Sequence, residues 1–285
     1  VAAFPRHLAT GLDARTGAIV WTFDPIPRDP ADPARASWQG GADVAGHANV
    51  WSTISVDRKR GWVFLPTSSP SPDFFGGLRP GDNRHANSVV ALEGATGRVV
   101  WSFQTVHHDV WDYDLPAQPG LYTLTIDGVA RDVVVQVAKT GLVFVLDRDT
   151  GEPVIPVEER PVPQGGAPGE TLSPTQPFPV RPGLLVPDRT APDKAFGLTI
   201  FDKAECAGKI RKLRAEGLYT PPTEQGTLFL PFTGGGANWG SAAFDASRNL
   251  VIVNVNNLAH EIRLIPADQV EAVEERRAGD AGRLA

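Results

Sequence analysis

Residues 107–114, His-His-Asp-Val-Trp-Asp-Tyr-Asp, bring ionisable and aromatic side chains together in a way that could support proton transfer. They follow an apolar, strand-like run at 99–103. A rigid scaffold commonly presents catalytic groups at the end of a strand. Asp112 lies between Trp111 and Tyr113, and desolvation by such rings raises the pKa of a carboxylate toward the range of a general base. The alternative is a solvated loop in which the Asp and His side chains cap local turns.

A lysine stands in a turn that follows a second apolar run. Lys139 opens the segment Lys-Thr-Gly directly after residues 133–138, so its ammonium is expected at a strand end. A point charge there can stabilise an oxyanion that develops during a reaction. A lysine in a hairpin turn is more commonly only solvated, so the residue type alone leaves both interpretations open.

The strand before the acidic run is part of a repeat. Residues 11–23 recur at 91–103, an offset of 80 residues, and a degenerate third copy covers 145–155. Each copy reads as a strand, an acidic turn with Thr-Gly, and a second strand. Trp21 and Trp101 occupy the same place in the first two copies, and we expect both to be buried in equivalent positions.

A second repeat supports the same architecture. Residues 51–65 match 239–253, and both begin with a Trp six residues before a turn Asp. Further hairpins are predicted at 127–128 and at 139–141, with β-branched runs on either side. Repeated antiparallel units of this kind predict an all-β fold of the β-propeller type. The turns account for about three to four blades, too few to close a ring.

Composition limits the class of protein. The net charge is −6, from 27 Lys+Arg against 33 Asp+Glu, and with no basic block this argues against nucleic acid as a partner. The 29 Gly and 26 Pro residues predict a turn-rich chain with few long helices. The single cysteine, Cys206, excludes an internal disulfide, a cysteine zinc site and attachment of a c-type haem. A chain without Met that opens on Val1 is expected to be an internal piece of a longer protein.

The propeller pattern is expected to cover residues 1–265. Residues 153–192 are rich in proline and aperiodic, which predicts a long surface excursion between blades. Helical spacing is confined to residues 202–217 and to the charged tail at 266–285. The tail is expected to be a frayed helix or a poorly ordered end.

Several segments carry a family likeness. The chain resembles the quinoprotein dehydrogenases, which use pyrroloquinoline quinone (PQQ) in an eight-bladed propeller, and most of all the membrane-bound glucose, quinate and shikimate branch. The resemblance covers residues 10–265 and implies that about half of the ring is present. It is carried by the Thr-Gly and Trp repeats together with three motifs, at 106–116, 138–141 and 220–226.

The resemblance implies roles for individual residues. Asp112 matches the catalytic base, and Lys139 matches a lysine that lies against the quinone oxygens. Trp51 matches a tryptophan that stacks on the flat cofactor, and Asn254 matches an asparagine at the cofactor edge. His107 is placed among the cofactor contacts, where it would also order the Asp112 loop by hydrogen bonds. We expect the side chains of Trp51, Asp112, Lys139 and Asn254 to converge on one end of the propeller axis.

The resemblance also implies partners. The intact protein would oxidise a sugar or polyol such as glucose or quinate, would hold a divalent cation (Ca²⁺ or Mg²⁺), and would pass electrons to ubiquinone through a membrane domain at the periplasmic face of the inner membrane. The family's Asp-Asn pair at the metal would fall just before Val1. Ser71 and Asp73 stand where the metal-side loop should be, but Ser is a poor ligand for a hard cation, so no metal ligand is assigned.

Two other functions remain open. A non-catalytic propeller could serve as a binding or assembly scaffold, because one fold hosts both uses. Such a scaffold would need the Trp repeats, yet would have no use for Asp112 and Lys139 on one axis. In that case Trp51, like its repeat counterpart Trp239, would be a structural Trp buried in a blade. A haem-bearing alcohol dehydrogenase would need a Cys-x-x-Cys-His segment, which this sequence lacks.

Overall fold

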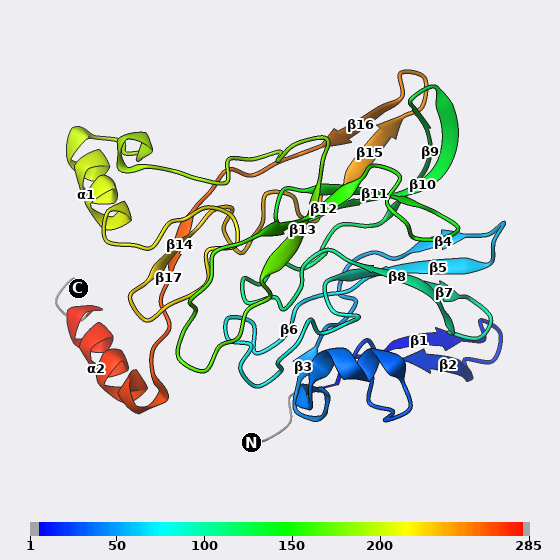
Figure 1. The fold of residues 1–285 in the computed structure, drawn as a ribbon, viewed down its shortest axis with the longest axis horizontal. Coiled ribbons are helices and arrows are strands. Elements are labelled where there is room, and N and C mark those ends of the chain that lie inside the picture. The colour runs from blue at the N-terminus through cyan, green and yellow to red at the C-terminus, as the bar shows by residue number, and fades with distance from the viewer. Residues whose placement is uncertain (1–5, 282–285) are drawn as a thin grey trace.

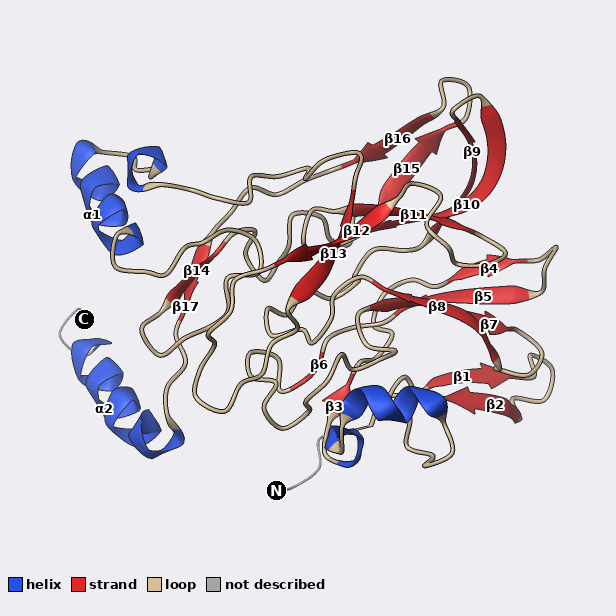
Figure 2. Cartoon of the chain, viewed as in Figure 1, coloured by secondary structure: helices blue, strands red, loops and turns tan. Residues whose placement is uncertain are grey.

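The computed structural model describes residues 6–281, and antiparallel strands dominate it. Figure 1 shows the blade-like sheets side by side along one side of the molecule, from β1 and β2 in blue to β15 and β16 in orange. The two α-helices lie on the opposite side, separated from these blades by long loops and short strand pairs (Figure 2).

One sheet is a complete four-stranded blade with the strand order β4-β5-β7-β8. All of its neighbouring strands run antiparallel. Its central strands are buried because their apolar residues face other sheets on both sides. The blade consists of β4 (Ser55–Asp57), β5 (Trp62–Pro66), β7 (Ser88–Glu93) and β8 (Val99–Gln104).

The other blades contribute two or three strands each. Asp127 and Gly128 have positive φ angles of 51° and 80° and make the tight turn of one predicted hairpin. The sheet that contains this turn has three strands, and it is followed only by an isolated bridge between Leu146 and Pro153, a residue with no N–H to donate to a longer ladder. These strands are β1 (Ala9–Leu12), β2 (Ile19–Phe23), β9 (Gly120–Ile126), β10 (Val129–Val137), β11 (Val143–Asp147), β15 (Ala242–Asp245) and β16 (Leu250–Val253).

The two repeat tryptophans each join one blade to the turn of the next. Trp21 Nε1 donates to the carbonyl of Gly94 (2.8 Å), and Trp101 Nε1 donates to the carbonyl of Arg148 (3.1 Å). Each indole also packs on the glycine of a Thr-Gly turn, where any side chain would collide with the ring. The expected equivalence is therefore present, although Trp21 is only half-buried while Trp101 is buried.

The remaining elements are short pairs and helices outside the blades. Helix α1 (Ile200–Ile210) begins at a capping box of Thr199 and Asp202, so it starts and ends earlier than the spacing at 202–217 predicts. Helix α2 (Val270–Ala281) lies in the charged tail. No helix in the described part of the chain is long and apolar enough to cross a membrane. The other elements are β3 (Gly46–His47), β6 (Pro70–Ser71), β12 (Val157–Pro161), β13 (Thr175–Pro179), β14 (Thr227–Phe229), β17 (His260–Ile262), and the 3-10 helices η1 (Pro33–Trp38), η2 (Gly41–Asp43), η3 (Pro192–Lys194) and η4 (Ala267–Gln269).

The proline-rich stretch at 153–192 differs from the expected surface excursion. It forms the antiparallel pair β12-β13, and the side chain of Gln176 is fully buried. The Gln176 amide accepts from His107 N–H (2.8 Å) and donates to His107 C=O (2.7 Å). It therefore satisfies both main-chain polar groups of His107, which lies outside any strand or helix. Part of the excursion therefore belongs to the core.

Glu170 of the same stretch makes a buried hydrogen bond to a histidine. Its carboxylate accepts from His108 Nε2 at 2.7 Å, and the two side chains are only 3% and 1% exposed. His108 Nδ1 lies 2.8 Å from the carbonyl of Gly81, so both ring nitrogens face acceptors. Burial alone would raise the pKa of Glu170, but the bonds from His108, Gly76 and Thr171 outweigh it and lower the pKa.

We expect Glu170→Ala to destabilise the protein by about 3 kcal/mol, because it leaves His108 Nε2 and the N–H groups of Gly76 and Thr171 without their acceptor, and a buried donor left unsatisfied costs about 1–3 kcal/mol. The free energy of unfolding is measured by urea denaturation. Glu158→Ala is the matched control, since Glu158 pairs with Arg160 on the exposed face of β12, and it should cost about 1 kcal/mol or less. Equal losses in the two variants would contradict a stabilising role for the buried pair.

Candidate active site

The acidic run follows β8 and is held by its aromatic residues. Trp111 and Tyr113 are each 1% exposed. Trp111 Nε1 donates to the carbonyl of Thr220 (2.9 Å), and the Tyr113 hydroxyl donates to the carbonyl of Pro231 (2.8 Å). Asp112 between them has a φ of 58°, which turns its side chain away from this buried pair. The rings anchor the loop and leave the Asp112 carboxylate at the surface of the core.

The buried Asp109 carboxylate stabilises the turn by hydrogen bonds to its main chain. It accepts from the N–H groups of Trp111 and Tyr113, both at 2.8 Å, and from Asn87 Nδ2 at 2.7 Å. The Ser69 hydroxyl donates to the same group. Burial raises the pKa of Asp109. These contacts give Asp109 a structural part in the loop, in line with its position before the turn.

Lys139 is not a solvated turn lysine. Its side chain is 5% exposed. The ammonium donates to the Asp112 carbonyl (2.8 Å), to Asp112 Oδ1 (3.1 Å) and to Asp114 Oδ2 (3.0 Å). The Lys139 ammonium therefore points into the protein. It lies between two carboxylates of a loop that precedes it by 25 to 27 residues in the chain.

The electrostatics of this cluster favour a protonatable carboxyl beside a permanent cation. Burial, followed by the charge of Asp114, raises the pKa of Asp112 to about 8, and Lys139 only partly opposes the shift. Burial lowers the pKa of Lys139, but the two carboxylates outweigh it and the net effect is a raised pKa. Asp112 can thus take up and release a proton near neutral pH while Lys139 stays charged.

The cluster borders a cavity of about 190 Å³. Trp51 stands at its rim with 36% of the residue exposed, and Lys139 Nζ lies 5.8 Å from the centre of its ring. Five polar residues of the lining come from the segments around β3 and β6 and were not assigned to the site from the sequence. The lining comprises His47, Asn49, Trp51, Ser68, Ser69, Asp73, Asp112 and Asp114.

Those five residues carried only a weak sequence signal. Ser68 and Ser69 lie in a run of small polar residues directly after β5, between that strand and Pro70. A polar run at a strand end is common in loops, and nothing in its composition points to Asp112. Only the pairing of β3 with β6 brings His47 beside this polar run.

Asn254 is connected to the cavity only through the neighbouring residues Trp239 and Trp51. The ring centres of Trp51 and Trp239 are 4.8 Å apart in an edge-on contact. Asn254 packs against Gly240, the neighbour of Trp239, at a place that a side chain on Gly240 would fill. Asn254 is exposed and does not line the cavity. The interpretation of Trp239 as a buried blade residue is wrong, because Trp239 is 57% exposed.

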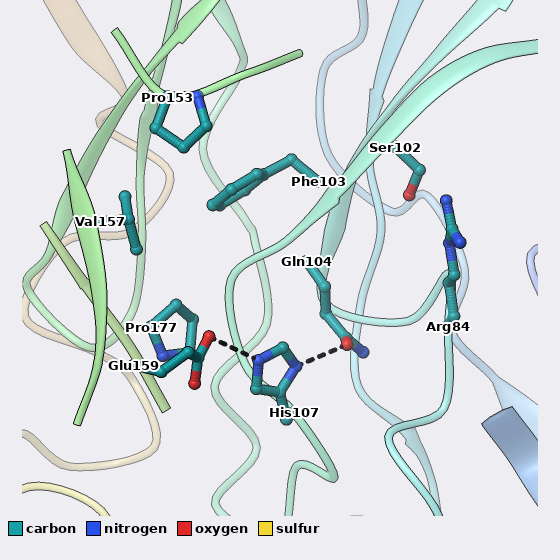
Figure 3. A pocket seen from close by; sticks show the side chains of 9 residues that line it. All are labelled: Arg84, Ser102, Phe103, Gln104, His107, Pro153, Val157, Glu159 and Pro177. Carbon is teal, nitrogen blue, oxygen red and sulfur yellow. Dashed lines mark hydrogen bonds and ion pairs between the residues drawn. The ribbon is translucent and has the colours of Figure 1, made fainter. Parts of the chain in front are cut away.

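The structure does not bring His107 to the Asp112 cavity. His107 lines a different cavity of about 320 Å³, next to Phe103 and Val157. There Nδ1 lies 2.8 Å from Gln104 Oε1 and Nε2 lies 3.1 Å from Glu159 Oε1, as Figure 3 shows. Because Gln176 fixes the main chain of His107 on both sides, the ring is directed toward β12 and away from Asp112. His107 is therefore not part of the site proposed below.

The family model for PQQ glucose/ethanol/alcohol dehydrogenases, β-propeller domain, matches residues 4–284. The chain belongs to this family. The antiparallel blades described above agree with the propeller that the family name states, and the expected fold class is confirmed.

Curated relatives place the chain within the family. It is 41% identical over 267 residues to a quinoprotein glucose dehydrogenase of Escherichia coli K12, covering 93% of this chain and 33% of the relative. It is 38% identical to a quinate/shikimate dehydrogenase (quinone) of Acinetobacter baylyi, covering 93% and 32%. The chain spans about a third of the length of these relatives.

Solved structures show the same fold at low sequence identity. A quinohaemoprotein alcohol dehydrogenase of Pseudomonas putida HK5 superposes with a TM-score of 0.64 at 23% identity, covering 93% of this chain and 35% of that one. A europium-containing methanol dehydrogenase gives a TM-score of 0.63 at 20% identity, covering 90% and 41%.

The residues of the cavity fit PQQ as a ligand. PQQ is a flat, anionic quinone, and the cavity offers an exposed indole face at Trp51 with a buried ammonium beside it. A metal has no comparable support here. Among the side chains that the structure describes, no group of three or more His, Cys, Asp or Glu is arranged to hold a metal ion, so the divalent cation remains a prediction without assigned ligands.

Proposed function

We propose that this chain is part of the propeller of a quinoprotein dehydrogenase that oxidises a hydroxyl of a sugar or polyol, such as glucose or quinate. The arrangement of Asp112 and Lys139 carries the proposal, because it joins a carboxyl able to exchange a proton to a buried cation beside an exposed indole. When bound, PQQ supplies the quinone that accepts hydride. The names of the relatives support the substrate class, and one of them includes a quinone acceptor.

Each residue of the site then has a part. Asp112 accepts the proton of the substrate hydroxyl, and general-base help of this kind contributes about 10²–10⁴ in rate. Lys139 holds a positive charge where negative charge develops on a quinone oxygen. Trp51 orients the flat ring system by stacking, which contributes about 0.5–1.5 kcal/mol beyond area burial. Asn254 is proposed to contact the cofactor edge from the neighbouring blade.

The proposal extends to the intact protein. It would use a divalent cation (Ca²⁺ or Mg²⁺), would pass electrons to ubiquinone through a membrane domain, and would act at the periplasmic face of the inner membrane. A non-catalytic scaffold is the competing function. A scaffold has no use for a lysine buried between two carboxylates, because desolvating such charges opposes folding.

The direct test is reconstitution of the full-length protein with PQQ and Ca²⁺ or Mg²⁺. Glucose, quinate and glycerol are offered with a dye acceptor and with a ubiquinone analogue, and turnover is followed with and without PQQ. We expect turnover of at least one substrate that depends on PQQ. Absence of both PQQ binding and turnover would contradict the proposal and favour a scaffold.

The pH dependence of kcat/KM follows from the raised pKa of Asp112. A general base must be deprotonated, so we expect the rate to rise with pH through about 8 and to fall as the pH drops below it. An unperturbed aspartate would place that limb near pH 4. The profile is measured from pH 5 to 10 at constant ionic strength. A flat profile above pH 5 would exclude Asp112, in this environment, as the base.

A further inference from the structure

The Lys139 ammonium has no N–H left to offer in the structure as it stands. An ammonium has three donors, and here they point at the Asp112 carbonyl, Asp112 Oδ1 and Asp114 Oδ2. A cofactor oxygen can bind Lys139 only if it replaces one of these acceptors. The question is which acceptor leaves and which one keeps the lysine in place.

The two carboxylates differ in how firmly they are held. The Asp112 side chain is 28% exposed, and among the groups that the structure describes its carboxylate has no hydrogen-bond partner except Lys139. The Asp114 side chain is 10% exposed and also accepts from the N–H of Ser69. Replacing the Asp112 bond, the longest of the three at 3.1 Å, therefore disturbs the fewest other contacts.

We propose that Asp114 is the positioning residue of this site: it holds Lys139 while the ammonium exchanges the Asp112 carboxylate for a cofactor oxygen, and this exchange frees Asp112 to act as the base. In this role Asp114 acts through Lys139, whose ammonium it holds by the bond to Asp114 Oδ2. The inference rests on the function proposed above, because it requires that a cofactor oxygen binds at Lys139.

The charges around Asp112 make the role of Asp114 measurable. Asp114 and Lys139 lie beside the Asp112 carboxylate, Asp109 lies behind it, and Asp73 and His47 line the same cavity. Asp114 is the largest charged contribution that raises the pKa of Asp112. Removing its charge should therefore lower the pKa of Asp112, so that the base is deprotonated at a lower pH.

The test is a double-mutant cycle on the full-length protein with PQQ as the ligand. Asp114→Asn is made alone and together with Lys139→Ala, and PQQ affinity is measured by titration of absorbance and tryptophan fluorescence. We expect Asp114→Asn to raise the Kd about tenfold or more when Lys139 is present, and about threefold or less when it is absent. The limb of kcat/KM should move by about one pH unit to lower pH. Asp127→Asn is the control, since Asp127 lies on an exposed hairpin and pairs with Arg181.

Each outcome decides the inference. Equal losses of affinity with and without Lys139 would overturn it, because a structural aspartate would act in both backgrounds. An unmoved pH limb would overturn it as well. If Asp114→Asn does not fold, Asp114→Glu replaces it, with the pH limb expected in place and PQQ binding weakened; unchanged binding would overturn the inference. If the wild type binds no PQQ, the proposed function fails instead, and the two failures are thereby distinguished.

Discussion

Replacing Asp112 with Asn is expected to remove most of the turnover of the full-length protein while leaving the fold and PQQ affinity nearly unchanged. The amide is close in shape to the carboxylate but cannot accept the substrate proton. Loss of a general base typically lowers the rate by about 10²–10⁴. Steady-state kcat with the best substrate measures the loss, and PQQ titration measures affinity, which should stay within about threefold of the wild type.

The matched control for this variant is Asp127→Asn, which makes the same chemical change on an exposed hairpin. The free energy of unfolding of both variants should differ from that of the wild type by about 1 kcal/mol or less, since the Asp112 side chain bonds only Lys139 among the groups that the structure describes. Near wild-type turnover in Asp112→Asn would remove the role of base and strengthen the scaffold alternative.

Replacing Lys139 with Ala is expected to impair PQQ binding, turnover and stability together. The ammonium lies between Asp112 and Asp114, and its loss leaves both carboxylates partly buried without a counter-charge. Breaking a buried pair by removing one partner costs about 3–5 kcal/mol. The free energy of unfolding is measured by urea denaturation at pH 6 and at pH 9, and PQQ affinity by titration.

The sign of the pH effect separates this variant from a simple packing defect. Without Lys139, burial and the charge of Asp114 raise the folded pKa of Asp112 unopposed, so it lies further above the unfolded value. The folded protein then binds more protons than the unfolded one between those values, and stability falls as the pH rises. We expect a larger loss at pH 9 than at pH 6. Lys59→Ala, in an exposed turn, is the control and should change neither stability nor binding. A loss that does not depend on pH would contradict the charge argument.

Local patterns in the sequence were sufficient to predict the blades. The Thr-Gly turn needs a glycine at positive φ, and Gly97 and Gly151 have φ angles of 73° and 74°. A Trp that packs on such a turn in the next blade recurs with the period of the blade. Turn chemistry and alternation depend on residues close in the chain, so the all-β fold follows without any knowledge of long-range contacts.

Which members of the acidic run face the cavity depended on tertiary structure. Residues 107–114 contain three aspartates. Composition does not distinguish Asp109, which is buried and stabilises the loop, from Asp112, which is partly exposed. The backbone angle of Asp112 and the burial of its two aromatic neighbours decide the difference. Those rings find partners more than 100 residues away, at Thr220 and Pro231.

The sequence by itself determined the propeller blades, the turn that carries Lys139 and the concentration of ionisable groups after β8, because each is a property of neighbouring residues. Only the tertiary structure decided that Lys139 is buried between two aspartates, that His107 faces another cavity, and that Glu170 enters the core. The physical reason is that side-chain direction, burial and charge pairing depend on segments 25 to 69 residues apart, which no local pattern encodes.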